Sequence, residues 1–366
     1  MRILHLDPDD IDNPLSGGGP VRTFEIYRRL ARRHEVTVLT PTFPGSTPEK
    51  IRDGVRYLRL GQRIGNHGSS HHITFFFALP MAVRRHPHDV LVEDLMPPMS
   101  ATLVPLVAQR PLIASVQWFF ARTLTRQYRM PFTLGERHGA KLYRNAVVLT
   151  GAMKRLFATL HPHANTVVIP NGVDDSLFDM PSEPGEGILY LGRIDFRQKG
   201  LDLLLQAYAR LPIRPILTLA GHGYESDQVR TLARRLGILA SIRLPGRVDA
   251  ATRALLLRSC RFVCVPSRDE TFGMVITEAC AAAKPVVLFD KAPMNEVAAP
   301  GACALVPPFD IPAFAAAMQR MCSLSDAGIL ALGATCRTWA RQYRWDKVAA
   351  AQESFYEGVV AAQGGT

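Results

Sequence analysis

The sequence of 366 residues lacks any long apolar run. A membrane-spanning helix needs about 20 consecutive apolar residues, and the nearest candidate, residues 75–83, is short and contains Pro80. The first residues also lack the apolar segment and small-residue cleavage site of a secretion signal. We therefore expect a cytoplasmic protein. Only Arg84 and Arg85, beside this apolar segment, suggest a weak contact with the inner face of a membrane.

Cysteine is scarce, and its spacing matches no metal site. None of the six cysteines belongs to a C-x-x-C pair, and no Cys/His spacing resembles a zinc site. All lie in the C-terminal half, mostly in apolar or alanine-rich surroundings: Cys260, Cys264, Cys280, Cys303, Cys322 and Cys336. We expect them to be buried free thiols that pack as small apolar side chains, and we predict no metal or cofactor.

The formal net charge of +11 comes without a basic tail, a zinc finger or an aromatic RNA-binding signature. The arginines are instead distributed along predicted helices, as in Arg28, Arg29, Arg32 and Arg33. Solvated helix faces therefore account for most of the charge, and we do not expect nucleic acid as a partner. The composition, 47% hydrophobic and 20% charged, is that of an ordinary globular protein.

Short β-branched segments alternate with helical segments in both halves of the chain. Strands are predicted in RILHLD, EVTVLTP, DVLVED, PLIASVQ and AVVLTGA, and further along in ILYLGR, ILTLAG, SIRLPG, RFVCVPS and PVVLF. This alternation predicts parallel sheets that are covered by helices on both faces.

The length and one linker-like stretch divide the chain into two domains. Residues 166–187 are rich in Pro, Gly and Asp, as expected of a linker. We predict an α/β protein with two Rossmann-like doubly wound domains that face a cleft. Their expected limits are residues 1–173 and 174–344, and a terminal helix over about 345–366 is expected to pack back on the first domain.

Three consecutive glycines, Gly17, Gly18 and Gly19, follow the first predicted strand. Glycines let a backbone approach a phosphate closely, and the following helix adds its positive end. The spacing is neither G-x-G-x-x-G nor that of an ATP-binding P-loop, so neither a nicotinamide cofactor nor ATP is indicated. A phosphate-binding loop and a plain flexible loop are both consistent with this segment.

Two cations flank the turn between a predicted strand and helix. Arg193 ends the strand and Lys199 opens the helix, so that both can converge on one diphosphate. The alternative is ordinary surface charge on a loop.

Two carboxylates surround the start of a later helix. Glu270 precedes the Phe272–Gly273 turn, while Glu278 lies about two turns inside the helix among apolar neighbours. An unpaired buried charge is costly. Glu278 is therefore interpreted as a partnered, functional carboxylate.

Together these motifs resemble glycosyltransferase family 4, retaining enzymes of the GT-B fold. The resemblance rests on Gly17–Gly19, VIPNGVD, LGRIDFRQKG, LAGHG and ETFGMVITE, and it extends over nearly the whole chain. It implies a nucleotide-diphosphate sugar donor bound mostly by the C-terminal domain, with no metal required. UDP is the first expectation for the nucleotide, and GDP is the second.

The resemblance also implies a role for each motif residue. Arg193 and Lys199 would bind the diphosphate, Glu278 the ribose hydroxyls and Glu270 the transferred sugar. The remaining donor contacts would come from glycine loops and the helix start: Gly18, Gly19, Gly246, Arg247, Val248, Phe272, Gly273 and Met274.

The sequence departs from the family where histidines often lie near the reacting sugar. Glu93 and Asp94 follow the fourth N-terminal strand instead, and Gln117 follows the next. We expect Glu93, Asp94, Gln117 and Trp118 to bind the acceptor: a glycan, a glycolipid or a small natural product such as an aminocyclitol. Asp94 is also a candidate catalytic group, beside Glu270, Arg193 and Lys199. Alternatively, one of the two carboxylates caps the next helix.

Two other functions remain open at this point. A nucleotide-sugar epimerase or hydrolase of the same fold would need an acid or base, for which Asp94 is the candidate. A non-catalytic nucleotide- or nucleic-acid-binding protein would leave Glu270 and Glu278 unexplained. The leading prediction is a retaining glycosyltransferase.

Overall fold

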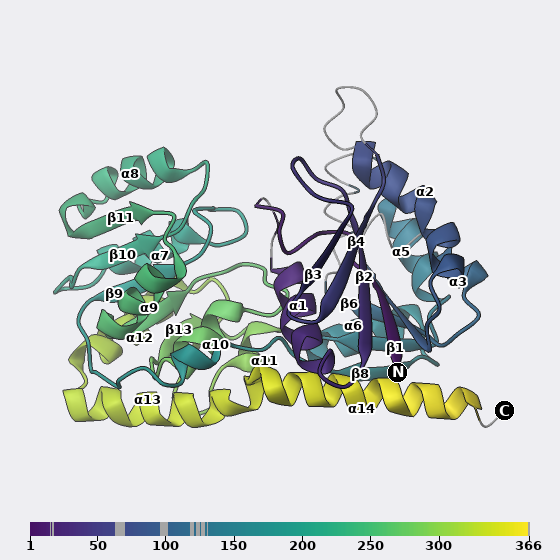
Figure 1. The fold of residues 1–366 in the computed structure, drawn as a ribbon. Coiled ribbons are helices and arrows are strands. Elements are labelled where there is room, and N and C mark those ends of the chain that lie inside the picture. Colours follow the sequence, from purple (N-terminus) through teal and green to yellow (C-terminus); the bar gives the residue numbers. More distant parts are fainter. Residues whose placement is uncertain are drawn as a thin grey trace. The chain divides into compact units, whose positions relative to one another are not determined.

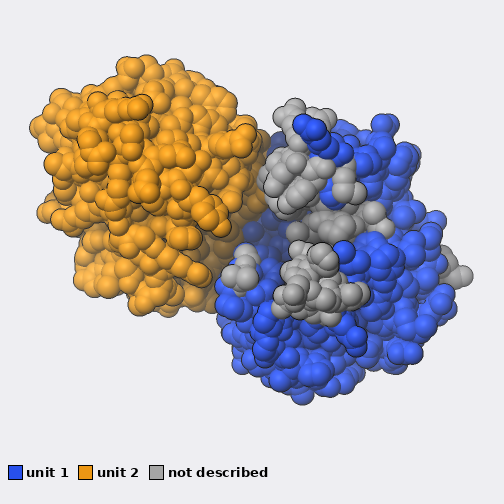
Figure 2. Space-filling view, turned by 90° about the horizontal axis from the view of Figure 1, so that it is seen from above, with its two compact units in different colours: residues 1–171, 345–366 blue, residues 172–344 orange. Residues whose placement is uncertain are grey.

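The chain folds into two compact units. The computed structural model describes residues 1–14, 16, 18–62, 70–95, 102–117, 121, 125, 129 and 131–364. Unit 1 comprises residues 1–171 and 345–366, and unit 2 comprises residues 172–344; Figure 2 colours them separately. No helix of the described residues is long and apolar enough to cross a membrane.

Unit 1 is built on an eight-stranded sheet with the order β3-β4-β2-β1-β5-β6-β7-β8 (Figure 1). The strands are β1 Arg2–Leu6, β2 Glu35–Pro41, β3 Glu49–Arg52, β4 Val55–Leu60, β5 Val90–Asp94, β6 Leu112–Val116, β7 Asn145–Val148 and β8 Asn165–Val168. Neighbouring strands pair in parallel, except that the edge strand β3 runs antiparallel to β4.

Helices cover both faces of this sheet, because successive strand residues point to opposite faces. Ile3 packs in one apolar cluster with α1 (Gly19–Leu30) and α14 (Trp345–Gly364). The next residue, Leu4, packs in a second cluster with α2 (Ser70–Arg85). Among the residues of this unit that the structure describes, the other helices are α3 Val104–Val107, α5 Phe132–Ala140 and α6 Gly151–Leu160.

Helix α14 belongs to unit 1 although it ends the sequence. It lies along α1, where the hydroxyls of Tyr356 and Tyr27 are 3.0 Å apart (Figure 1). Trp345 and Val348 of α14 join the apolar cluster beneath α1. The last helix therefore completes the core of the first unit.

Unit 2 is built on a six-stranded, wholly parallel sheet with the order β11-β10-β9-β12-β13-β14. The strands are β9 Ile188–Leu191, β10 Leu217–Ala220, β11 Ile242–Gly246, β12 Phe262–Val265, β13 Val286–Phe289 and β14 Ala304–Val306. The helices are α7 Leu201–Ala209, α8 Ser226–Arg235, α9 Ala250–Ser259, α10 Met274–Ala281, α11 Met294–Val297, α12 Ile311–Ser323 and α13 Asp326–Ala340.

The predicted α/β class with parallel, doubly wound sheets is confirmed. The pattern did not indicate β3 and β4, in a segment rich in charged residues. Strand β8 occupies residues 165–168, at the start of the stretch that was expected to be a linker. It is an edge strand that pairs with β7 only, and its residues are exposed or half-buried.

Each sheet has one point at which the strand order reverses. In unit 1 this point lies between β1 and β5, and in unit 2 between β9 and β12. Ligands of such sheets bind outside the carboxyl ends of the strands at this reversal. The segments after β1, β5, β9 and β12 are therefore the first places to look for a site.

Candidate active site

In unit 2, the loops after β9 and β10 are in close backbone contact. A Cβ atom on Gly221 would lie 1.7 Å from the carbonyl oxygen of Gly192, and Gly221 has a φ of +154°. Only glycine fits at this position. The contact fixes the loop that carries Arg193.

Arg193 is held by two neighbours. Its guanidinium donates to Oε1 of Gln198, and its carbonyl accepts from the Tyr190 hydroxyl at 2.5 Å. Burial raises the pKa of Tyr190, and the negative charge of Glu270 raises it further. Arg193 and Glu270 thus lie near the same tyrosine.

Lys199 and Glu270 form an ion pair across the β9/β12 reversal. The lysine Nζ lies 2.6 Å from Oε1 of Glu270, and the Ser267 hydroxyl donates to the same oxygen at 2.7 Å. Their side chains are 19% and 13% exposed, respectively. The structure therefore brings together the predicted diphosphate cation and the predicted sugar ligand, with one partner that the sequence analysis did not identify.

Arg268 anchors the loop that carries Glu270. Its guanidinium bonds both carboxylate oxygens of Asp202 at 2.7 Å, and its amide N–H donates to the carbonyl of Gln198 at 2.8 Å. The loop after β12 is therefore tied to the segment between β9 and α7. Sequence reasoning gave Arg268 no role, because its partner lies 66 positions earlier in the chain.

The start of α10 offers backbone N–H groups. Gly273 precedes the helix with a φ of +93°, and no side chain caps this end. The Phe272 ring is buried edge-on against Tyr343, with ring centroids 5.9 Å apart. Only the backbone of Phe272 is therefore available to a ligand, beside Gly273 and the half-buried Met274. An uncapped helix start attracts anions.

Glu278 is buried and paired, as its surroundings in the sequence indicated. Its Oε1 lies 2.8 Å from Nη1 of Arg253, a residue of α9. Burial raises the pKa of Glu278, the Arg253 guanidinium lowers it, and the charge of Asp174 raises it again. Arg253 was missed because only the fold brings α9 beside α10.

The predicted loop after β11 leads into the helix that carries Arg253. Gly246 has a φ of +79° and accepts from the Gly221 amide at 2.9 Å. Arg247 is exposed and Val248 is half-buried. The loop is therefore connected both to the glycine contact at β10 and to α9.

In unit 1, Asp94 lies at the β1/β5 reversal and has two close partners. Its Oδ1 is 3.3 Å from Nε2 of His5, and its Oδ2 accepts from Gln117 at 2.7 Å. The Gln117 side chain in turn faces the start of α1, where a Cβ on Gly19 would meet Oε1 at 3.4 Å. Gly18 is the N-cap of that helix. Four predicted site residues therefore lie near one strand end.

A buried chain of hydrogen bonds extends from His5, which lies beside this carboxylate, to α14. His5 bonds the Tyr27 hydroxyl at 2.6 Å, which in turn lies 3.0 Å from the Tyr356 hydroxyl. Gln352 donates to that second hydroxyl at 2.6 Å. Sequence reasoning found none of these residues, because a histidine inside a buried strand carries no local signal of function.

Asp7 adds a second carboxyl group beside Asp94. Burial and the nearby Asp94 charge raise the pKa of Asp7 well above its usual range, and the Thr23 hydroxyl donates to it at 2.7 Å. The environment therefore favours the neutral form of the Asp7 carboxyl group.

Glu93 does not fit its predicted role in acceptor binding. It is 0% exposed, and its carboxyl group accepts from the Tyr143 hydroxyl at 2.7 Å. Burial raises the pKa of Glu93 to about 7. Asp94 is also buried, at 2% exposed, so the two differ in their partners: Glu93 bonds Tyr143, whereas Asp94 bonds Gln117 at the strand end. Nor does either carboxylate cap α3, whose N-cap is Leu103. Gly17 and Trp118 lie outside the described residues.

Comparison with known proteins identifies the family. The model for glycosyltransferase family 4 matches residues 16–177, and that for glycosyl transferases group 1 matches residues 180–328. A phosphatidyl-myo-inositol mannosyltransferase of Mycolicibacterium smegmatis is 32% identical over 384 residues, which cover 99% of this chain and 95% of that protein. The enzyme of that name from Mycobacterium tuberculosis is 29% identical over 388 residues, with 99% and 98% coverage.

Solved structures share the fold at low identity. A sucrose-phosphate synthase from Thermosynechococcus elongatus superposes with a TM-score of 0.80 at 20% identity and covers 99% of both chains. Anabaena HepE in complex with UDP and glucose has a TM-score of 0.77 at 18% identity, with 98% of this chain and 100% of that chain covered. The chain therefore belongs to glycosyltransferase family 4 and is a glycosyltransferase of the GT-B fold.

Proposed function

We propose that the protein is a retaining hexosyltransferase that moves a sugar from a nucleoside-diphosphate donor to a hydroxyl of a glycolipid-type acceptor. The observation that carries this proposal is the Lys199–Glu270 pair at the β9/β12 reversal. A cation for the diphosphate and a carboxylate for sugar hydroxyls are adjacent there, as a donor with both groups requires.

The donor side of the proposal draws on unit 2. Arg193, Lys199 and the amides at the start of α10 would hold the diphosphate, and Glu278 the ribose. The relatives that match the whole chain are named for mannosyl transfer, which makes mannose the first candidate for the sugar. UDP remains our first candidate for the nucleotide, supported by HepE, whose structure contains UDP; GDP is the alternative.

The charge that develops during the reaction accounts for the cations and helix N–H groups at the proposed donor site. Cleavage of the anomeric bond builds positive charge on the sugar and negative charge on the departing diphosphate. Fixed cations and helix N–H groups stabilise the negative charge without having to reorganise during the reaction, so the proposed scheme uses no metal. Attack on the same face of the sugar, with the leaving phosphate accepting the proton of the acceptor hydroxyl, retains the configuration.

The acceptor side draws on unit 1. Asp94, fixed by His5 and Gln117, is the carboxylate we assign to an acceptor hydroxyl. The Gln117 side chain is the second candidate contact.

An exposed apolar stripe on α2 supports a lipid-linked acceptor. Ile73, Phe77 and Met81 recur every four residues and are 59%, 69% and 52% exposed. Arg84 continues the helix and lines a cavity of about 150 Å³ with Arg2, Arg110, His86 and His88. Apolar side chains beside a basic hollow suit the surface of an anionic membrane. The full-length relatives, named for a phosphatidylinositol substrate, point the same way.

Two substitutions test the assignment of the donor site. In Glu270→Gln and Lys199→Ala, we expect the transfer rate to fall at least about 100-fold, the typical effect of removing one electrostatic group from a reacting centre. Glu183→Gln, which breaks the exposed Arg258–Glu183 pair of the same unit, is the matched control and should leave the rate unchanged. Near-normal rates in both site variants would refute the assigned roles.

The donor and the stereochemistry need separate measurements. UDP- and GDP-hexoses are compared by thermal shift, because a bound donor raises the unfolding temperature according to its affinity. NMR of the product then reports the anomeric configuration. An inverted product would contradict the retaining mechanism while leaving the donor assignment intact.

A further inference from the structure

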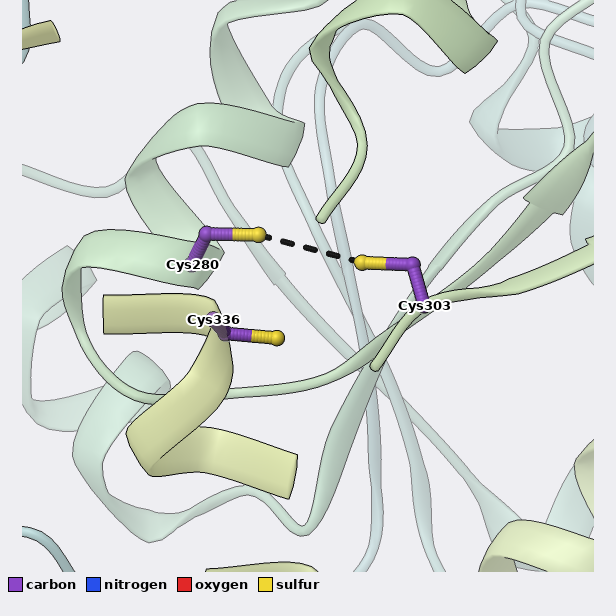
Figure 3. A group of neighbouring side chains, drawn as sticks. All are labelled: Cys280, Cys303 and Cys336. Atoms are coloured by element: carbon purple, nitrogen blue, oxygen red, sulfur yellow. Dashed lines mark hydrogen bonds between the residues drawn. The ribbon is translucent and has the colours of Figure 1, made fainter. Parts of the chain in front are cut away.

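Three cysteines of unit 2 converge on one point. Cys280 lies at the end of α10, Cys303 in the segment between α11 and β14, and Cys336 in α13. The sulfur atoms of Cys280 and Cys303 are 3.8 Å apart, and all three lie within 4.8 Å of one another. Their side chains point into one shared space (Figure 3). All three are free thiols.

The close packing of α13 on the end of α10 produces this convergence. A Cβ on Gly333 would lie 2.3 Å from the carbonyl oxygen of Ala283, so α13 needs glycine at its closest approach. Arg337, which follows Cys336, donates to the Ala281 carbonyl at 3.1 Å. The positions of two of the three thiols are therefore fixed by rigid backbone contacts.

The spacing fits a metal ion bound by three sulfur atoms. A metal–sulfur bond of about 2.3 Å places the corners of a trigonal site about 4 Å apart. The observed separations, 3.8 Å for one pair and up to 4.8 Å overall, require only small side-chain adjustments. A disulfide, by contrast, needs sulfur atoms about 2.05 Å apart.

A set of three sulfur ligands restricts which metal ion the site can bind. Within the described residues, which include all of unit 2, no His, Asp or Glu joins this group of three sulfurs. Structural zinc sites almost always have four protein ligands. Thiolate ligands alone favour soft ions, of which Cu(I) is the first-row example.

Cys303 is the half-buried member of the three cysteines, whereas Cys280 and Cys336 are buried. An ion can therefore reach the three sulfur atoms from the side of Cys303.

We propose that Cys280, Cys303 and Cys336 form a three-coordinate thiolate site that binds one Cu(I) ion. Binding displaces the thiol protons, which leave to solvent, and involves no change of oxidation state. The ion joins α10, the α11–β14 segment and α13. Cys280 is two residues from Glu278, so the site also fixes the helix that carries this carboxylate.

The test is an anaerobic titration of the full-length reduced protein with Cu(I) against a chromophoric Cu(I) chelator. We expect one tightly bound ion per chain and an X-ray absorption spectrum with three sulfur neighbours. Cys303→Ser should lower the affinity at least 100-fold. Cys322→Ser, at another half-buried cysteine of the same unit, is the matched control and should bind as the wild type does.

Three results would overturn the proposal: no ion bound at one per chain, equal affinity in Cys303→Ser, or tighter binding of Zn(II) than of Cu(I). Circular dichroism establishes that each variant is folded. If Cys303→Ser is unfolded, Cys336→Ala takes its place, with the same expected loss and the same contradicting result.

Discussion

At the scale of single residues, Glu93 and Asp94 show how the fold separates two adjacent carboxyl groups. Both belong to β5, and a strand sends successive side chains to opposite faces. Glu93 bonds Tyr143 in the interior, whereas Asp94 contacts His5 and Gln117 at the strand end. From the sequence alone, both residues were expected to bind the acceptor, and Asp94 was also a candidate catalytic group.

The pH dependence of stability follows from Glu93. Its pKa rises from 4.5 to about 7 on folding, so the folded state binds more protons between these values. Stability therefore falls as pH rises through this window, by on the order of 3 kcal/mol in total. Glu93→Gln keeps an acceptor for Tyr143 but does not titrate. We expect its stability relative to wild type to increase from pH 5 to pH 8, as measured by urea denaturation; a constant difference would contradict this.

The same pair gives a matched test of catalysis. In Asp94→Asn, we expect kcat to fall by about 10²–10³, because an amide oxygen accepts a weaker hydrogen bond from the acceptor hydroxyl than a carboxylate does. Glu93→Gln should keep kcat within a factor of a few, since its side chain touches no ligand. Steady-state kinetics on both variants at pH 7 decide the matter. Equal losses would mean that the site depends on the strand as a whole.

At the scale of elements, the start of α10 is the most demanding segment of unit 2. Gly273 adopts a φ of +93°, a conformation that costs other residues about 1–2 kcal/mol. The first amides of any helix lack acceptors within the helix, and no side chain caps those of α10. The sequence marked the glycine, but only the backbone shows that its conformation is required.

Gly273→Ala separates stability from binding. We expect it to lose about 1 kcal/mol of stability and to weaken donor binding at least about tenfold, since the helix start must shift. Gly237→Ala is the control, because Gly237 has a φ of +68° beyond the end of α8 and a Cβ there meets nothing within 4 Å. It should lose similar stability and keep the donor affinity, measured by calorimetry. Equal affinities in both variants would exclude a binding role for the turn.

At the scale of the whole molecule, α2 carries the exposed apolar surface that we propose contacts a membrane. Its exposed stripe is not needed for the core, because Phe75 and Leu79 face the sheet while Phe77 and Met81 face outward. An apolar stripe without a structural task indicates a partner.

Vesicle sedimentation tests this partner. The double variant Phe77→Ser and Met81→Ser should lose at least tenfold in binding to vesicles that contain an anionic phospholipid, and wild-type binding should weaken with salt. Ile213→Ser, at a residue of unit 2 that is 76% exposed, is the control and should bind normally. If the wild-type protein does not bind anionic vesicles, the proposed membrane contact is wrong. The proposal of sugar transfer does not depend on this result.

The sequence by itself determined the class of fold and indicated the residues that we propose to bind the donor. The alternation of β-branched and helical segments predicts parallel sheets that are buried on both faces. This alternation is a local property of the sequence, so it could be recognised without knowledge of the tertiary contacts. Arg193, Lys199 and Glu270 were selected because each lies at a strand end or a helix start, where the local sequence is distinctive. Glu278 was selected because it is a carboxylate among apolar neighbours inside a helix. Family membership then followed from their joint spacing.

Only the tertiary structure decided which groups are partners. The ion pairs of Glu278 with Arg253 and of Lys199 with Glu270 join residues 25 and 71 positions apart. Neither periodicity nor spacing encodes such contacts, because strand order sets them. The opposite orientations of Glu93 and Asp94, and the meeting of three cysteines that share no motif, have the same cause: packing between distant segments creates environments that no single segment contains.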